Sequence, residues 1–192
     1  FTSISENATT GAITTLSSIS STGVTSFDAN TLATEAGTGI TTGSGTIYRS
    51  SVQRVGGIIT TRILIDLTGL RSTGSGDIIG VNGTSLVCHI GQITAAQNGT
   101  ILTGSMECFE APAGGDPDIN VHSATEGTGV EDGAIADLTE TLLVNAGDAT
   151  LGSKVYFSAV PAADEFLYLT TGDATDADYT AGKLFIEMMG YA

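Results

Sequence analysis

The residues best suited to catalysis or metal binding are two histidines and two cysteines among 192 residues. Histidine supplies acid–base chemistry, and together with cysteine it ligates zinc, but zinc sites repeat these ligands at short spacings. His89 and His122 lie 33 residues apart, and neither has a second His or Cys at such a spacing. Cys88 precedes His89, and neighbouring side chains in a strand point to opposite faces. We therefore expect both histidines to be structural.

Carboxylates are the second group with chemical capacity. Asp173, Asp176 and Asp178 lie close together and could donate oxygen ligands to Ca²⁺. An EF-hand loop requires a central Gly and a terminal Glu at fixed spacing, and this segment has neither. The pattern therefore favours like charges on a solvated turn over a calcium site. The same interpretation applies to two other acidic pairs, Asp116 with Asp118 and Glu131 with Asp132.

Sequence motifs for catalysis are missing. The chain contains no Gly-x-Ser-x-Gly elbow, phosphate-binding loop, His-Glu-x-x-His motif or dinucleotide fingerprint. Two carboxylates can still meet from distant parts of a fold, as they do in glycosidases. The chain has no Trp, however, and few other aromatic residues that could stack on a sugar. We therefore predict a structural protein that is not an enzyme and needs no cofactor.

The charge balance narrows the choice of partners. Six Lys or Arg stand against 21 Asp or Glu, which gives a formal net charge of −15. Binding to a nucleic-acid backbone needs clustered cations, so a nucleic-acid partner is excluded. No stretch approaches the roughly 18 consecutive apolar residues of a membrane-spanning helix, so we also expect no membrane partner. The acidic field favours protein partners with a basic face.

Four of the six basic residues fall within one 23-residue window: Arg49, Arg54, Arg62 and Arg71. They could be ordinary solvated strand positions. They could also form a polar patch that binds carboxylates on a partner subunit, because the guanidinium group suits bidentate pairing. The sequence leaves both interpretations open, and we take the four arginines as candidate partner-binding residues.

Cys88 and Cys108 flank Asn98-Gly99, a dipeptide that strongly favours a hairpin turn. With a two-residue turn, Cys88 would lie opposite Phe109, and Cys108 would point to the other face of the sheet. A disulfide would need a bulge or a longer loop to correct this register. We therefore predict two free, buried thiols, which fits folding in a reducing cytoplasm.

Residues 1–45 differ in composition from the remainder. Ser, Thr, Gly and Ala dominate, and no positive charge precedes Arg49. Such a segment cannot bury enough apolar surface on its own to offset the loss of chain entropy. It is either a disordered tail or an extended arm that packs on a neighbouring subunit, and its spaced apolar residues favour the arm. The candidate contact residues in it are Ile4, Ile13, Leu16 and Ile19.

Residues 46–192 form the predicted body, in which short β-branched runs alternate with turns. The strongest strand is 58–67, which places Ile63, Ile65 and Leu67 on one face. Only 134–143 has the character of a short helix. We predict an all-β fold, a β-sandwich or a jelly-roll or barrel-like body with an extended N-terminal arm. Further strands are expected at 46–52, 86–93, 100–109, 119–122, 139–144, 154–160, 166–170 and 182–191.

Several blocks of this body resemble the structural proteins of marine tailed phages. The blocks are Leu67-Thr68-Gly69-Leu70, Gly76-Asp77-Ile78-Ile79-Gly80, Ile90-Gly91-Gln92-Ile93 with the following 94–100, Pro112–Ile119, Ala124–Asp132 and Tyr179–Glu187. They span about residues 46–192. The chain thus resembles the head decoration (cement) proteins of short-tailed phages that infect marine bacteria.

The resemblance implies a virion protein that is made in the host cytoplasm and binds the outside of the major capsid protein shell. It implies a homotrimer, and it transfers no catalytic residues. An alternative in the same particle is a tail or fibre component. Two further alternatives are a secreted surface-filament subunit, joined by donated strands, and a calcium-dependent carbohydrate-binding module, which would rest on the Asp clusters alone.

Overall fold

The computed structural model describes residues 18–19, 25–26 and 30–192. Of the predicted arm contacts, Ile4, Ile13 and Leu16 lie outside the described residues, and Ile19 falls within β1. The strands are β1 (Ser18–Ile19), β2 (Thr25–Ser26), β3 (Ile47–Val55), β4 (Ile58–Asp66), β5 (Arg71–Ser72), β6 (Thr100–Ala113), β7 (Ile119–Ala124), β8 (Glu140–Val144), β9 (Lys154–Tyr156), β10 (Phe166–Thr171), β11 (Ala177–Asp178) and β12 (Ala181–Tyr191). Short helices are α1 (Thr38–Thr41), α2 (Ala95–Asn98) and the 3₁₀ helix η1 (Ile135–Asp137).

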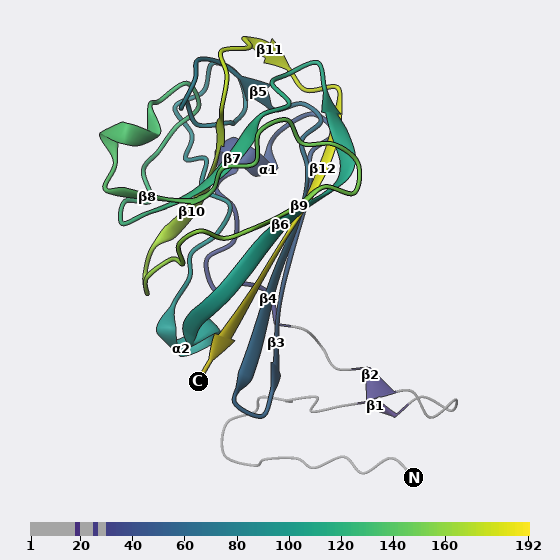
Figure 1. Cartoon of the computed structure of the whole chain (residues 1–192), viewed down its shortest axis with the longest axis vertical. Helices are drawn as coiled ribbons and strands as arrows, with labels where there is room; N and C mark the ends of the chain where they lie inside the picture. Colours follow the sequence, from purple (N-terminus) through teal and green to yellow (C-terminus); the bar gives the residue numbers. More distant parts are fainter. Residues whose placement is uncertain (1–17, 20–24, 27–29) are drawn as a thin grey trace, which may run out of the picture.

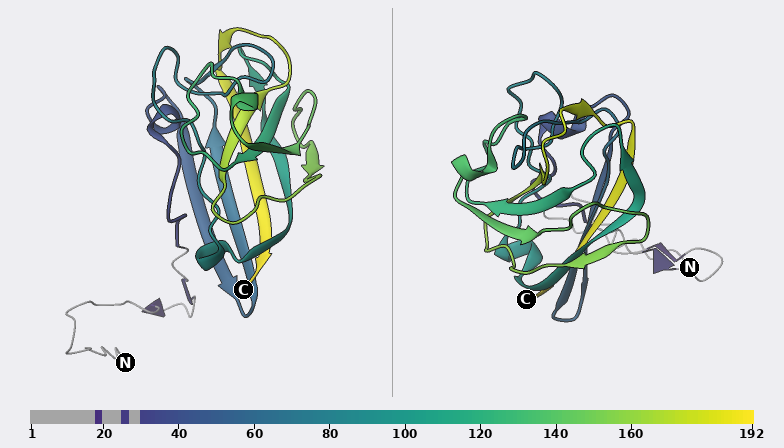
Figure 2. Two further views of the ribbon diagram at one scale, coloured as in Figure 1. Left: turned by 90° about the vertical axis from the view of Figure 1, so that its left-hand side faces the viewer. Right: turned by 45° about the horizontal axis from the view of Figure 1, so that its top comes forward.

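Two antiparallel sheets face each other and enclose the core (Figures 1 and 2). The larger has five strands in the order β3-β4-β12-β6-β9, and the smaller has three in the order β10-β7-β8. Two-stranded ribbons, β1 with β2 and β5 with β11, complete the strand pairing. The predicted all-β, sandwich-like fold is confirmed.

The large sheet buries one face because its central strands alternate. In β4, Ile59, Ile63 and Ile65 have no exposed surface, whereas Arg62 and Leu64 between them are half-buried. β12 repeats the pattern with Leu184 and Ile186 inside. Each such aliphatic side chain contributes about 1.5–3 kcal/mol when buried. The predicted inward face of 58–67 is confirmed.

The predicted hairpin around Asn98-Gly99 is wrong. Residues 95–98 form helix α2, and β6 pairs with β12 and β9 rather than with 86–93. The strand predicted at 86–93 is also wrong: Val87 makes an isolated bridge to Val130, and Ile90 N–H donates to Leu167 O of β10 at 2.7 Å. The predicted opposition of Cys88 and Phe109 fails with the hairpin. Both cysteines are nevertheless free and buried, as predicted.

Two predicted boundaries also require correction. The helix predicted at 134–143 is only η1, after which the chain enters β8. The body begins before residue 46, because Leu32 and Ile40 are buried in its core. Val52 N–H also donates to Asn30 O beside β3. Residues 30–45 therefore belong to the packed body and not to the arm.

Candidate interaction surface

The five-stranded sheet presents one face to the core and the opposite face, here called the outer sheet face, to the exterior. Strand register determines which side chains lie on it. The pairs Ile47–Asp66, Arg49–Leu64 and Ser51–Arg62 join β3 to β4, and the same rows of side chains extend to partner residues on β12, β6 and β9. Its residues are Ile47, Arg49, Ser51, Gln53 and Val55 of β3; Ile58, Thr60, Arg62, Leu64 and Asp66 of β4; Lys183, Phe185, Glu187, Met189 and Tyr191 of β12; Thr103, Ser105, Glu107, Phe109 and Glu110 of β6; and Lys154 and Tyr156 of β9.

The outer sheet face is electrically balanced. It holds four of the chain's six cations and four carboxylates, so the remainder of the chain carries the whole net charge of −15. Arg62 Nε lies 2.7 Å from Glu187 Oε2, and Lys154 Nζ lies 3.4 Å from Glu107 Oε2. On the same face, Lys183 pairs with two carboxylates. Its Nζ lies 3.3 Å from Asp66 Oδ2, and it also pairs with Glu110. The hydrogen bonds that Lys183 donates to Glu110 and to Asp66 raise the pKa of Lys183.

An aromatic pair occupies the same face. The rings of Phe109 and Phe185 stack with centroids 5.2 Å apart and planes 10° apart. A register irregularity between Lys183 and Leu184 leaves Phe109 without a direct partner on β12 and turns it toward Phe185. Phe109 remains about half exposed at 48%. Exposed aromatic side chains within a charge-balanced face are typical of protein–protein contacts.

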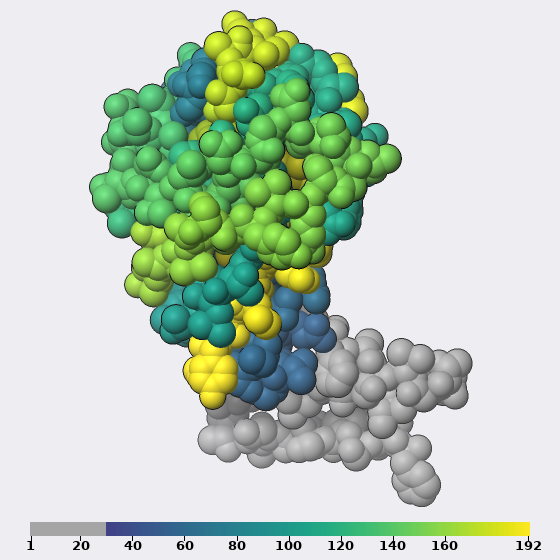
Figure 3. Space-filling view, in the orientation of Figure 1, coloured from purple at the N-terminus to yellow at the C-terminus, as the bar shows by residue number. Residues whose placement is uncertain are grey.

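One end of the large sheet is apolar, and we call it the tip: residues 52–61, 98–104 and 188–192. These 22 residues contain no Asp or Glu and one cation, Arg54. Figure 3 shows them at the lower end of the body as blue, teal and yellow atoms. Its large exposed side chains are Val55, Ile58, Leu102, Met189 and Tyr191, each 39–70% exposed.

The opposite end is acidic, and we call it the crown: residues 71–77, 114–118, 131–134 and 172–178. These 23 residues hold eight carboxylates and one cation, Arg71. Arg71 pairs with Asp176 at 2.7 Å and with Asp178 at 2.9 Å. Asp116 is buried, and its carboxylate accepts hydrogen bonds from the backbone N–H groups of Asp118 and Asp173.

Carboxylates of the crown repel one another. Burial and the neighbouring Asp116, Asp173 and Asp148 raise the pKa of Asp118. Burial likewise raises the pKa of Glu131. Among the described residues, no group of three or more His, Cys, Asp or Glu side chains is arranged to hold a metal ion.

The four candidate arginines do not form one patch. Arg49 and Arg62 lie on the outer sheet face, on neighbouring strands. Arg54 projects from the same side of β3 as the inward-facing Tyr48 and Val52, but it lies at the exposed end of the strand, in the tip. Arg71 lies in the crown at the other end of the molecule (Figure 1). If the arginines form a partner-binding patch, which was one of the two interpretations, Arg71 lies outside it.

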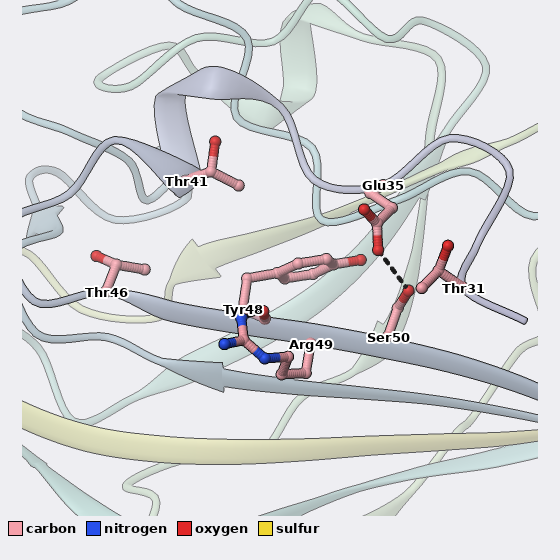
Figure 4. Close-up of a pocket in the computed structure, with 7 residues that line it drawn as sticks. All are labelled: Thr31, Glu35, Thr41, Thr46, Tyr48, Arg49 and Ser50. Atoms are coloured by element: carbon pink, nitrogen blue, oxygen red, sulfur yellow. Dashed lines mark hydrogen bonds between the residues drawn. The ribbon is translucent and has the colours of Figure 1, made fainter. Parts of the chain in front are cut away.

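The hollow between β3 and the α1 segment has a volume of about 400 Å³ (Figure 4). The Tyr48 hydroxyl donates to Ile90 O at 2.9 Å, and burial holds its pKa well above the ordinary value. Ser50 Oγ donates to Glu35 at 3.0 Å. These hydrogen bonds tie the polar side chains of the hollow to neighbouring groups of the protein. Its lining residues are Thr31, Glu35, Thr41, Thr46, Tyr48, Arg49 and Ser50.

Both histidines contact neighbouring side chains. His89 is buried against Phe166, with ring centroids 5.0 Å apart, and burial lowers its pKa. His122 Nδ1 lies 2.7 Å from Glu140 Oε2.

Neither the aromatic pair nor the tip was predicted from the sequence. Phe109 and Phe185 are 76 residues apart, and the tip combines three distant segments. The one available signal was the lack of acids in 52–61, 98–104 and 188–192 within an acidic chain.

Comparisons with known proteins add no relative. The chain matches no protein-family model, no curated protein and no solved structure. Within the described part of the chain, no helix has the length and apolar character needed to cross a bilayer. The structure therefore defines the class, an all-β sandwich with a charge-balanced outer sheet face.

Proposed function

We propose that this chain is a structural protein of a virion, a decoration protein that binds the outside of the major capsid protein shell and stabilises the expanded head. It acts without a cofactor and without catalysis, as a homo-oligomer. The part of the outer sheet face outside the tip contacts the shell, and the crown stays exposed to the solvent.

The segregation of charge is the observation that carries this proposal. A protein with a net charge of −15 is repelled by most acidic surfaces unless it approaches with a neutral or cationic face. The outer sheet face is such a face, and it presents Arg49, Arg62 and the Phe109–Phe185 pair. An acidic crown directed outward would keep decorated particles from adhering to one another.

The mechanism that we propose is mass action. A protein that binds the expanded shell and not the unexpanded one stabilises the expanded state by RT ln(1 + [L]/Kd), about 2.7 kcal/mol at a hundredfold excess over Kd. Several copies joined into one oligomer would add avidity, because the second contact becomes intramolecular. The sequence blocks that resemble phage decoration proteins lie in residues 46–192, the part that contains every strand of the outer sheet face.

Co-sedimentation with expanded empty shells from the phage that encodes the chain tests this proposal. Wild-type protein should pellet with shells at a fixed stoichiometry. Arg62→Glu breaks the pair with Glu187 and adds negative charge to the face, so it should weaken binding at least about tenfold.

The double variant Arg62→Glu/Glu187→Arg restores both the pair and the balance, so it should recover binding. Wild-type protein that ignores shells would contradict the proposal. Binding to isolated tails would favour a tail or fibre component, and growth of the protein alone into filaments would favour a surface-filament subunit.

A further inference from the structure

We propose that the tip is the surface through which one copy of this chain binds a second copy. The inference names a contact for the self-association in the proposed function, but it is argued from the tip alone. It can be tested without shells.

Apolar exposure is concentrated at the tip. Five of the twelve large apolar side chains exposed in the described residues lie there: Val55, Ile58, Leu102, Met189 and Tyr191. The tip comprises 22 of the 163 residues in 30–192, the range for which exposure is described, so exposure of this kind is several times denser there than in the remainder of that range. Contiguous exposed apolar side chains mark protein–protein contacts, because their burial is favourable at about 25 cal/mol per Å².

Electrostatics selects a second copy as the occupant. Two molecules of net charge −15 repel each other at every acidic surface, and the tip is free of carboxylate side chains. β12 begins next to the crown and ends in the tip, and its 11 residues span about 35 Å at 3.2–3.4 Å each. Copies that meet at their tips therefore hold their crowns apart by several times the Debye length of about 8 Å. A basic partner would gain no electrostatic attraction from a surface without acidic side chains. A second acidic copy needs such a surface, because acidic side chains would repel it.

The tip is also rigid before binding. The β3–β4 turn uses Gly56 at φ +61°, and a Cβ atom on Gly57 would lie 2.7 Å from the Tyr191 ring, so the ring packs directly on this glycine. Ala192 N–H donates to Gly57 O at 2.9 Å. Beneath them, buried Asn98 donates to Thr61 Oγ1 at 2.8 Å. A surface that is already ordered loses little conformational entropy on association.

The test is the mass of the full chain in solution, measured by light scattering and sedimentation from about 1 to 100 μM. Wild-type protein should self-associate in this range, which corresponds to about −6 to −8 kcal/mol. Raising the salt concentration should strengthen the association, because salt screens the repulsion between acidic bodies and leaves the apolar contact intact.

Val55→Glu and Leu151→Glu form a matched pair. Val55 is 70% exposed in the tip, and Leu151 is 73% exposed in a turn outside it. Both variants add one negative charge, yet only Val55→Glu should raise the dissociation constant, by at least about tenfold. Tyr191→Ser, which removes apolar area without adding charge, should act in the same direction. Unchanged thermal melting of each variant would show that it remains folded.

Three results would overturn the inference. They are a wild-type protein that stays monomeric throughout the range, equal effects of Val55→Glu and Leu151→Glu, and association that salt weakens. The last would indicate an interface of ion pairs, such as the outer sheet face. Shell binding by a monomer would leave the shell-binding role standing while removing the homo-oligomer and this inference, so the two failures are distinguishable.

Discussion

The tip and the crown contain nearly the same number of residues at opposite ends of one sandwich, yet the crown holds eight carboxylates and the tip none (Figure 1). The difference follows from how each end satisfies its backbone. The tip is mostly strand, where the ladder pairs N–H with C=O. The crown is mostly loop, where unpaired N–H groups need side-chain acceptors.

Aspartates supply those acceptors in the crown. Asp77 accepts from Gly74 N–H at 2.7 Å and from the Thr73 hydroxyl at 3.1 Å, and Asp116 accepts from two further N–H groups. Short acidic side chains favour turns for this reason. The negative charge of the crown is therefore partly a consequence of its loop structure, whereas the strand ladder of the tip leaves few N–H groups that need a side-chain acceptor.

Placing a carboxylate inside the tip should have the largest effect on stability. Asn98→Asp removes the donor to Thr61 Oγ1 and buries a charge at a site with no exposed surface. Thr94 N–H still donates to one oxygen at this site, but desolvating the buried charge should cost about 3 kcal/mol or more of the free energy of unfolding. Urea denaturation at pH 7 measures it. Ala96→Asp adds the same charge at an exposed neighbour and should change the free energy by less than about 0.5 kcal/mol.

Removing a carboxylate from the crown should have a smaller and opposite effect. Asp118 is partly buried among like charges, and its Oδ1 has no hydrogen-bond partner. Asp118→Asn keeps the shape, removes the repulsion and adds a donor, so it should stabilise the fold by about 0.5 kcal/mol. The exposed Asp137 serves as a control. An equal gain from Asp137→Asn would attribute the effect to net charge alone.

The pH dependence of that gain should be smaller still. Because the folded pKa of Asp118 is raised, the folded protein binds this proton more readily than the unfolded chain does. Wild-type stability therefore gains from this group as the pH falls through the raised pKa. The advantage of Asp118→Asn should shrink between pH 7 and pH 4, as measured by denaturation at each pH. If the stability advantage of Asp118→Asn grew on acidification, the pKa of Asp118 would be lowered in the folded protein and not raised.

The alternating strands were predictable because period-2 burial is a local pattern, as Ile63 and Ile65 show. The Asn98-Gly99 turn was not, because the same dipeptide suits a hairpin and the end of a short helix. Thr94 Oγ1 accepts from Gln97 N–H at 3.3 Å at the start of α2, and Gly99 adopts φ +68° at its end. Thr61, on a distant strand, holds the Asn98 side chain. A long-range contact decided between two locally equivalent structures.

The candidate surface was likewise predictable only where it depends on local strand patterns. That Arg49 and Arg62 lie on one face follows from strand parity and register, given the β3–β4 hairpin. The separation of Arg71 could not be predicted, because its partners Asp176 and Asp178 lie more than 100 residues later in the chain. The tip likewise requires the antiparallel pairing of β12 with both β4 and β6, which no local pattern specifies.

Carboxyl footprinting of shell-bound protein tests the central claim most directly. Carbodiimide labelling with mass spectrometry would compare free and bound protein at the outer sheet face, at Glu107, Glu110 and Glu187, and in the crown, at the exposed Asp132, Asp173 and Asp176. We predict that binding protects the three glutamates and leaves the three aspartates fully labelled. Protection of the crown with an unprotected outer sheet face would contradict the account.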